Sequence, residues 1–232
     1  MIDINNIGKY RENNRIEAKK ATGGLPDSLW ETYSAFANTL GGVILLGVEE
    51  YPDRSLHTVD LPDTDWMLKD FRDMINDQSK VSVNILREDD VSVKTIDGKH
   101  IIVINVPRAD RSCKPVYIGG DPYSGTYRRN GDGDYRCSRE EVEALISESR
   151  SYDPVEDTEQ YKAVVEAADI AAQEELERSS WTRRDSEDGI YFSWCYTFWD
   201  IKKRILKEQY DIDWQTPAEY ASVRTKEGNT EE

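Results

Sequence analysis

An uninterrupted apolar run of strand length, residues 43–48, limits most strongly how this 232-residue chain can fold. The run reads Val-Ile-Leu-Leu-Gly-Val and follows the pair Gly41-Gly42. A strand with one solvated face alternates apolar and polar residues, whereas a strand covered on both faces is apolar throughout. The run therefore predicts a central strand with elements packed on both sides of its sheet.

The segments around this run predict helices and strands in irregular order. Helices are expected over 28–40, 63–77 and 138–149, of which the first and last open with the capping boxes of Ser28 and Ser138. Strands are expected at 15–21, 80–87, 91–96, 99–106, 114–118 and 126–129, with a hairpin turn at Asp97-Gly98. Because strands and helices do not alternate regularly, we expect an α+β fold with a mixed β-sheet and packed helices.

The character of the chain changes after Asp153-Pro154. Residues 153–232 hold 20 acidic and 10 basic residues, and helical spacing is expected over 156–178 and 190–210. In the second segment Trp194, Phe198, Ile201 and Ile205 share one helical face. We predict a domain at 1–152 and a helical, acidic and aromatic C-terminal extension at 153–232, with a frayed tail at 225–232. The aromatic helix has two interpretations: docking onto the domain, or a surface for a protein partner or a second copy.

Composition excludes several classes of function. No stretch approaches the roughly 18 apolar residues that a membrane span needs, so we expect a cytoplasmic protein without membrane contact. The three cysteines have neither metal-site spacing nor an even number, which favours reduced thiols. His57 and His100 are the only histidines. Any acid-base chemistry would therefore fall to carboxylates.

Basic residues gather in two segments although the net charge is −16. Residues 107–139 hold seven basic against four acidic residues, and residues 1–24 hold five against three. Arginine beside tyrosine provides both a phosphate contact and a stacking surface. The candidate nucleic-acid contacts are Arg15, Lys114, Tyr127, Arg128, Arg129 and Arg136.

Six short motifs carry a resemblance to a known family. They are Glu12 with Glu17-Ala18-Lys19, Ser34-Ala35-Phe36-Ala37-Asn38-Thr39-Leu40-Gly41-Gly42, Leu46-Gly47-Val48-Glu49-Glu50, Lys114-Pro115-Val116-Tyr117, Thr126-Tyr127-Arg128-Arg129-Asn130-Gly131 and Arg136-Cys137-Ser138. In this order they resemble the AlbA-like domain of the Schlafen type, over approximately residues 8–150. Nothing beyond residue 153 resembles a family.

The resemblance implies a small α+β module that binds DNA or RNA. Bacterial members are regarded as DNA-binding or transcription-associated domains, and some animal relatives cleave structured RNA, tRNA included, with three carboxylates near a divalent metal. Two of those acids correspond to Glu12 and Glu17, and the third falls on Glu49 or Glu50, where the family usually has aspartate. Mg²⁺ or Mn²⁺ is the cofactor expected on the nuclease interpretation, with Lys19 as a phosphate partner.

The spacing of the first two acids sets a geometric condition. Five residues on a straight strand would place Glu12 and Glu17 on opposite faces. They converge only if the chain bends, and Asn13-Asn14 is suited to a turn. The alternative is that both acids form ion pairs with neighbouring basic residues, Lys19 among them. Asn38 is expected to cap or brace the turn from helix to strand.

Three functional hypotheses follow. The first is a non-enzymatic nucleic-acid-binding module, with a regulatory role connected to transcription. The second is a metal-dependent endoribonuclease acting on structured RNA such as tRNA, with Glu12, Glu17 and Lys19 in the active site. The third is an interaction protein whose acidic, aromatic tail masks the basic groove or binds a partner. The first is favoured, because the resemblance and the basic segments agree.

Overall fold

The computed structural model describes residues 7–8, 10–150, 159–178, 194–216 and 219. The chain divides into two compact units, Met1–Cys137 and Ser138–Glu232, here called the N-terminal and C-terminal units. The domain boundary predicted after residue 152, the helical residues 156–158 and 190–193, and the tail 225–232 lie outside the described residues.

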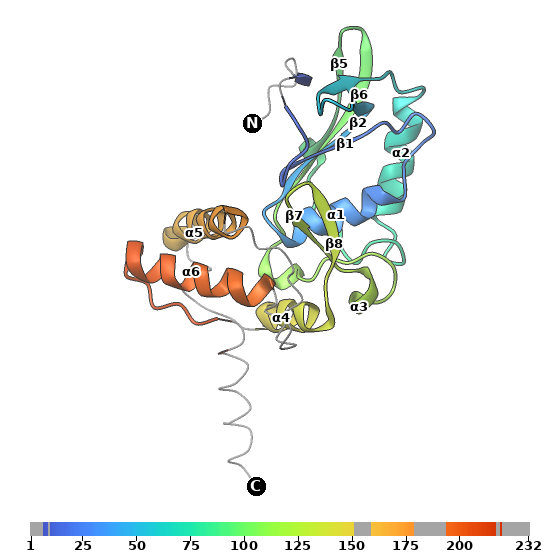
Figure 1. Ribbon diagram of the computed structural model, residues 1–232. Coiled ribbons are helices and arrows are strands. Elements are labelled where there is room, and N and C mark those ends of the chain that lie inside the picture. The colour runs from blue at the N-terminus through green and yellow to red at the C-terminus, as the bar shows by residue number, and fades with distance from the viewer. Residues whose placement is uncertain (1–6, 9, 151–158, 179–193, 217–218, 220–232) are drawn as a thin grey trace, which may run out of the picture. The chain divides into compact units, whose positions relative to one another are not determined.

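The N-terminal unit contains a four-stranded mixed sheet (Figure 1). Its strands, in the order β1-β2-β6-β5, are Ile16–Lys19, Gly42–Leu46, Lys99–Val106 and Val91–Ile96. β1 is parallel to β2, whereas β2 with β6 and β5 with β6 are antiparallel. The helices are α1 (Ser28–Asn38), α2 (Thr64–Ile75) and the short α3 (Pro122–Gly125). The α+β class and the mixed sheet are confirmed.

Strand β2 is covered on both faces, as its apolar run predicts. Ile44 and Leu46 pack in one core with Phe36 of α1 and Phe71 of α2. Leu45 packs in a second core, which includes residues of the N-terminal segment and of the two-stranded hairpin β3 (Val48–Glu50) and β4 (Leu56–Thr58). All three β2 side chains are fully buried. The helices therefore cover one face of the sheet and the β3–β4 hairpin covers the other.

The predicted strand 43–48 is interrupted at Gly47. Gly47 has φ +84°, and a Cβ atom there would lie 2.9 Å from both the Leu61 Cγ and the Val59 carbonyl oxygen. The chain uses this glycine to leave the main sheet, and Val48 begins β3 in a different sheet.

Two of the predicted strands are wrong. Residues 80–87 and 114–118 form only isolated bridges, Val81 with Ile118 and Tyr117 with Thr126. The Tyr33 hydroxyl accepts from the Ile85 amide at 2.9 Å and donates to the Val83 carbonyl at 3.1 Å. Burial raises the pKa of Tyr33 to about 12, so the hydroxyl remains a donor. At Val83 and Ile85, the Tyr33 side chain therefore makes the hydrogen bonds that a neighbouring strand would make.

The helix starts differ in detail from the prediction. Asp27, not Ser28, precedes α1, and no side chain caps it. Glu31, expected to complete a capping box, accepts a hydrogen bond from the Tyr127 hydroxyl at 3.0 Å. In α2 the buried side chains are Met67, Phe71 and Ile75, whereas Trp66 is 55% exposed.

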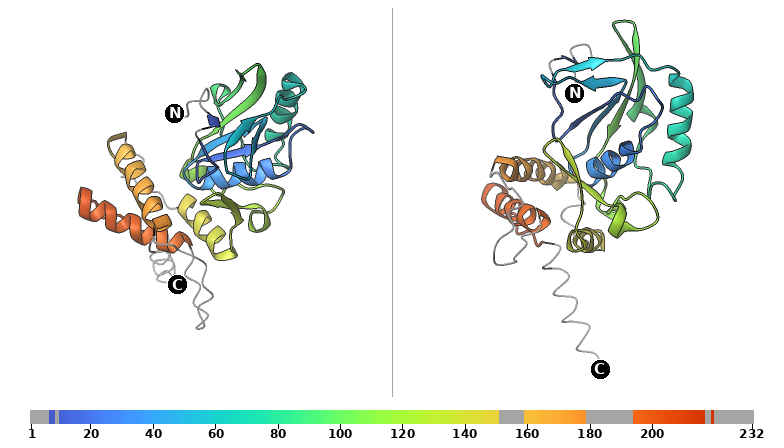
Figure 2. Two further views of the ribbon diagram at one scale, coloured as in Figure 1. Left: turned by 45° about the horizontal axis from the view of Figure 1, so that its top comes forward. Right: turned by 45° about the vertical axis from the view of Figure 1, so that its right-hand side comes forward.

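Two hairpins complete the unit. Asp97 and Gly98 both have positive φ and join β5 to β6, which confirms the predicted turn. A strand absent from the prediction, β8 (Gly133–Arg136), pairs with β7 (Tyr127–Asn130). Gly131, φ +61°, opens their two-residue turn. The turned views in Figure 2 show this hairpin beside α1.

The C-terminal unit is helical: α4 (Arg139–Arg150), α5 (Glu159–Arg178) and α6 (Trp194–Tyr210). Phe198 and Ile205 of α6 are buried in this unit's own core, with small residues of α5. The predicted helices and the capping box of Ser138 with Glu141 are confirmed. Helix α4 lies within the domain predicted at 1–152, whereas its contacts within the folded chain group it with the C-terminal unit. No helix in the described ranges is long and apolar enough to cross a membrane.

Candidate nucleic-acid interface

The chain bends between Glu12 and Glu17, as their spacing requires. Asn13 and Ile16 form a bridge, with their amide-to-carbonyl distances at 3.2 and 3.4 Å. The bend returns Glu12 toward β1, where its Oε1 accepts a hydrogen bond from the Ala18 amide at 2.9 Å. The prediction of a turn at Asn13-Asn14 is confirmed, and both acids lie beside the same stretch of chain.

Arg129, from β7, holds this bend from within the protein. Its guanidinium donates to the Asn13 carbonyl at 2.8 and 3.2 Å and to the Ile16 carbonyl at 3.2 Å. It also forms ion pairs with Glu17 at 2.9 Å and Asp134 at 2.8 Å. Burial lowers the pKa of Arg129, but the two carboxylates outweigh burial and leave that pKa raised. A buried positive charge thus joins the bend to the β7–β8 hairpin.

The six predicted nucleic-acid contacts separate into two groups. Lys114, Tyr127 and Arg129 are buried, at 6%, 6% and 0% exposure. Arg129 is therefore an internal ligand of the bend and not a surface contact, which corrects its assignment. Along β7 the side chains alternate between inside and outside, so that Arg128 faces out where Arg129 faces in. Arg15 and Arg136 are exposed, and Arg128 is half-buried.

Each face of the β7–β8 hairpin pairs an arginine with an aromatic ring. The Arg128 guanidinium lies 5.8 Å from the centroid of Tyr135, which is 51% exposed, and these residues are partners in the ladder. On the opposite face, the exposed Arg136 lies at the same distance from the centroid of Tyr127, whose ring is buried. Tyr135 was missed by the sequence analysis because β8 was missed. The dipeptide Gly131-Asp132, with a glycine at the first turn position, was the signal that could have revealed it.

The structure brings together only some of the four candidate acidic residues. Burial and the charges of Glu17 and Glu50 raise the pKa of Glu12, against the opposing effects of a backbone hydrogen bond and Arg129. Glu49 instead forms an ion pair with Lys20 at 3.1 Å. Of the two candidates for a third acid, Glu50 is therefore the one whose charge acts on Glu12.

The carboxylate oxygens of Glu17 are already engaged. Oε1 lies 2.8 Å from the Lys19 ammonium, and Oε2 lies 2.9 Å from the Arg129 guanidinium. Within the parts of the chain that the structure describes, no three His, Cys, Asp or Glu side chains are grouped so as to hold a metal ion. Mg²⁺ and Mn²⁺ need free carboxylate oxygens. In this arrangement the predicted ligand set does not fit a divalent ion, and Lys19 neutralises Glu17.

The raised pKa of Glu12 gives a prediction about stability. An acid with a raised pKa binds more protons in the folded state, so stability falls as pH rises through the window between its unfolded and folded pKa values. We expect Glu12→Gln to increase the free energy of unfolding at pH 7, with the gain disappearing below about pH 4. Urea unfolding across this pH range measures it.

Glu17→Gln is the matched control. It removes a partner of the buried Arg129, so we expect it to lower the free energy of unfolding at pH 7. A loss of stability in the Glu12 variant at neutral pH would contradict the charge arrangement described here.

Comparison with known proteins gives a family match and two similar structures. The model of the family described as Schlafen, AlbA_2 matches residues 12–138, more than half of the chain. The N-terminal domain of an ATP-dependent DNA helicase RecG-related protein from Nitrosomonas europaea is 35% identical, with a TM-score of 0.43, over 56% of this chain and 88% of that chain. The DIP2311 protein from Corynebacterium diphtheriae is 20% identical, with a TM-score of 0.41, over 71% of this chain and 32% of that chain. No curated protein matches.

Proposed function

The chain belongs to the Schlafen AlbA_2 family, and from this membership we propose that its N-terminal unit binds nucleic acid. The observation that carries the proposal is the exposed face of the β7–β8 hairpin. There Arg128 lies over the 51% exposed ring of Tyr135 at 5.8 Å. The next residue along β8, Arg136, is exposed as well. Arginine supplies phosphate contacts and tyrosine supplies stacking, the two interactions that nucleic-acid surfaces combine.

The buried Arg129 supports the same surface. It connects the β7–β8 hairpin to the bend that carries the exposed Arg15, so the basic side chains of two distant segments belong to one rigid arrangement. With a net charge of −16, the chain repels polyanions elsewhere. We therefore propose binding of modest affinity, anchored at this surface and strongly dependent on salt.

The test is binding of folded tRNA and of duplex DNA to the full chain, measured by fluorescence anisotropy at several salt concentrations. We expect Arg128→Ala/Arg136→Ala to weaken binding by roughly tenfold at low salt and to reduce the slope of log affinity against log salt by about 2. Arg72→Ala, at an exposed arginine of α2, is the matched control. It should change neither the affinity at low salt nor the salt slope. An unchanged slope in the double variant would refute the proposal.

The endoribonuclease hypothesis has one supporting observation, the charges of Glu17 and Glu50 acting on Glu12. The ion pairs of Glu17 oppose it. The same tRNA incubated with Mn²⁺ or EDTA distinguishes the alternatives. Metal-dependent cutting that disappears in Glu12→Gln/Glu17→Gln would establish the enzyme, and binding without cutting supports the module.

The C-terminal unit carries no part of this proposal. Phe198 and Trp199 are buried inside it, at 7% and 3% exposure, so those aromatic side chains are not available to a partner. Masking of the basic surface, an oligomer formed through α6 and a role in transcription all stay predictions. Binding by itself is common to regulators and to enzymes that act on nucleic acid.

A further inference from the structure

The β3–β4 hairpin presents a stacked aromatic pair to solvent. The rings of Tyr51 and His57 have centroids 4.0 Å apart and planes inclined by 28°. Tyr51 is 47% exposed, and His57 is exposed as well. His57 pairs with Glu49 in the ladder, whereas the neighbouring residues Val48 and Leu56 are buried in the core. The aromatic pair therefore lies on the outer side of the hairpin.

Hydrogen bonds hold this pair in position. The His57 Nε2 and the Ser55 hydroxyl lie 2.7 Å apart, and Ser55 donates from both its hydroxyl and its amide to Asp53 Oδ1, at 2.5 and 3.0 Å. The backbone closes the turn, since the Tyr51 amide donates to the Ser55 carbonyl at 2.9 Å. The Tyr51 ring is thus supported on the His57 side by ordered groups, although it lies in solvent.

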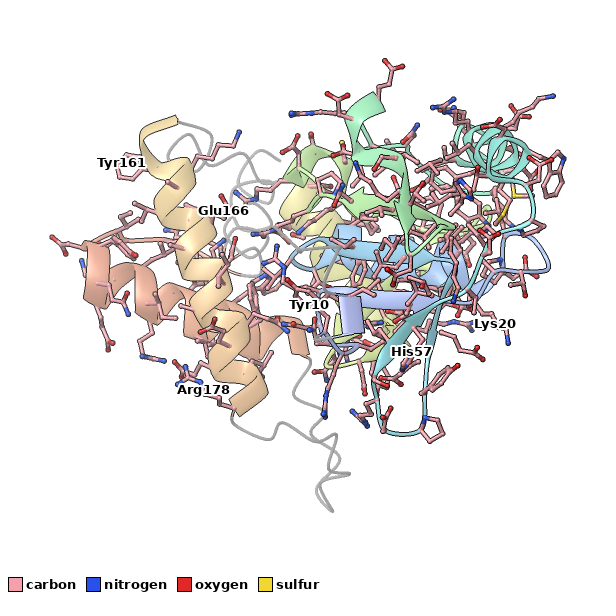
Figure 3. All side chains as sticks on the ribbon, turned by 90° about the horizontal axis from the view of Figure 1, so that it is seen from above. Tyr10, Lys20, His57, Tyr161, Glu166 and Arg178 are labelled. Atoms are coloured by element: carbon pink, nitrogen blue, oxygen red, sulfur yellow. The ribbon has the colours of Figure 1, made fainter. Side chains whose placement is uncertain are left out.

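The charges around the pair indicate what kind of ligand fits. The hairpin carries Glu49, Glu50 and Asp53 against Arg54, which disfavours a site built for phosphate. Lys20 lies beside it through its ion pair with Glu49, and Figure 3 shows the Lys20 and His57 side chains on the same side of the N-terminal unit. A flat, uncharged π surface fits a preorganised tyrosine face better than a phosphate does.

We propose that Tyr51 is a stacking site for an unpaired nucleobase of a single-stranded or looped nucleic acid. This inference rests on the proposed function, because the backbone of the same molecule would be held at the arginines of β7–β8. Bases inside a duplex expose no face for stacking. The hairpin therefore gives the protein a preference for unpaired nucleotides that the basic surface alone does not provide.

A purely structural role for the pair gives a different expectation. Cross-strand aromatic pairs stabilise hairpins without any ligand. In that case loss of the ring would reduce the unfolding midpoint and affect every nucleic acid equally. Stacking predicts a loss specific to unpaired bases.

The experiment uses the full chain and a single-stranded oligonucleotide carrying 2-aminopurine, with a duplex of the same sequence as the second ligand. We expect Tyr51→Ala to weaken single-strand binding about tenfold, to abolish the change in 2-aminopurine fluorescence and to leave duplex binding unchanged. The factor by which Tyr51→Ala weakens single-strand binding should be the same at low and high salt, because stacking releases no counterions from phosphate. Tyr51→Phe keeps the ring and should bind like the wild type.

Trp66→Ala is the matched control, since Trp66 is an exposed aromatic residue on α2 in the same unit. The Trp66 variant should bind the single strand and the duplex with the affinity of the wild type. Wild-type binding with no loss in Tyr51→Ala would overturn the stacking site and leave the proposed function intact, as would an equal loss for both ligands with a lowered unfolding midpoint. Failure of the wild type to bind any nucleic acid would overturn both.

Discussion

Replacing Arg129 with methionine is expected to lower the free energy of unfolding of the N-terminal unit by about 3–5 kcal/mol. The methionine keeps much of the side-chain volume but leaves Glu17 and Asp134 without the cation that neutralises them. It also removes the donors to the Asn13 and Ile16 carbonyls. Urea titration measures the loss, and hydrogen exchange of the β1 and β7 amides assigns it to this unit.

Arg54→Met is the matched control for this experiment. Arg54 also forms an ion pair with an aspartate of the β7–β8 turn, Asp132, at 3.4 Å, but the two side chains are 61% and 53% exposed. Exposed pairs contribute roughly 0–1 kcal/mol, so little change is expected. If the two variants lost similar amounts of unfolding free energy, burial of Arg129 would not be what makes its ion pairs stabilising.

Asn38→Ala is expected to cost roughly 2–4 kcal/mol, because it leaves buried backbone groups without partners. The Asn38 amide nitrogen donates to the carbonyls of Val116 at 2.7 Å and Tyr127 at 3.0 Å, and its oxygen accepts from the Val116 amide at 2.8 Å. Asn38 therefore joins α1 to β7 and to the extended segment before it. Thermal or urea unfolding of the full chain measures the cost.

Asn105→Ala provides the comparison. Asn105 is exposed, and its side chain makes a long hydrogen bond of 3.4 Å to the Asp90 carbonyl. We expect a change within about 0.5 kcal/mol. An Asn38 variant as stable as this control would mean that water replaces the lost hydrogen bonds, and that Asn38 does not hold β7 against α1.

Arg129 and Asn38 show that the proposed interface depends on residues that never reach its surface. Asn38 fixes the start of β7 against α1, and Arg129 fixes its outer end against the bend after Glu12. Arg128, between them along β7, is thereby held outward beside Tyr135. Substitutions at the buried positions should therefore weaken nucleic-acid binding through lost stability, and substitutions at Arg128 through lost contact.

Sequence patterns predicted the fold correctly where they depend on a local property of the chain, such as burial or a turn. The run of residues 43–48 reports burial on both faces, and Asp97-Gly98 reports a turn with positive φ; both were confirmed. The strand predicted at 80–87 rests on the residue types of that segment, and Val81 is buried there. Residue types do not report the hydrogen-bonding neighbours, which here are Tyr117 for Ser82 and the Tyr33 side chain for Val83 and Ile85.

The sequence alone determined the α+β class, the central strand and the need for a bend between Glu12 and Glu17, because periodicity and spacing act along the chain. Tertiary structure alone decided that Arg129 faces inward, that Glu49 pairs with Lys20, and that Tyr51 stacks on His57. These outcomes depend on contacts between segments up to 116 residues apart. Burial and charge at such contacts arise only when the chain is folded.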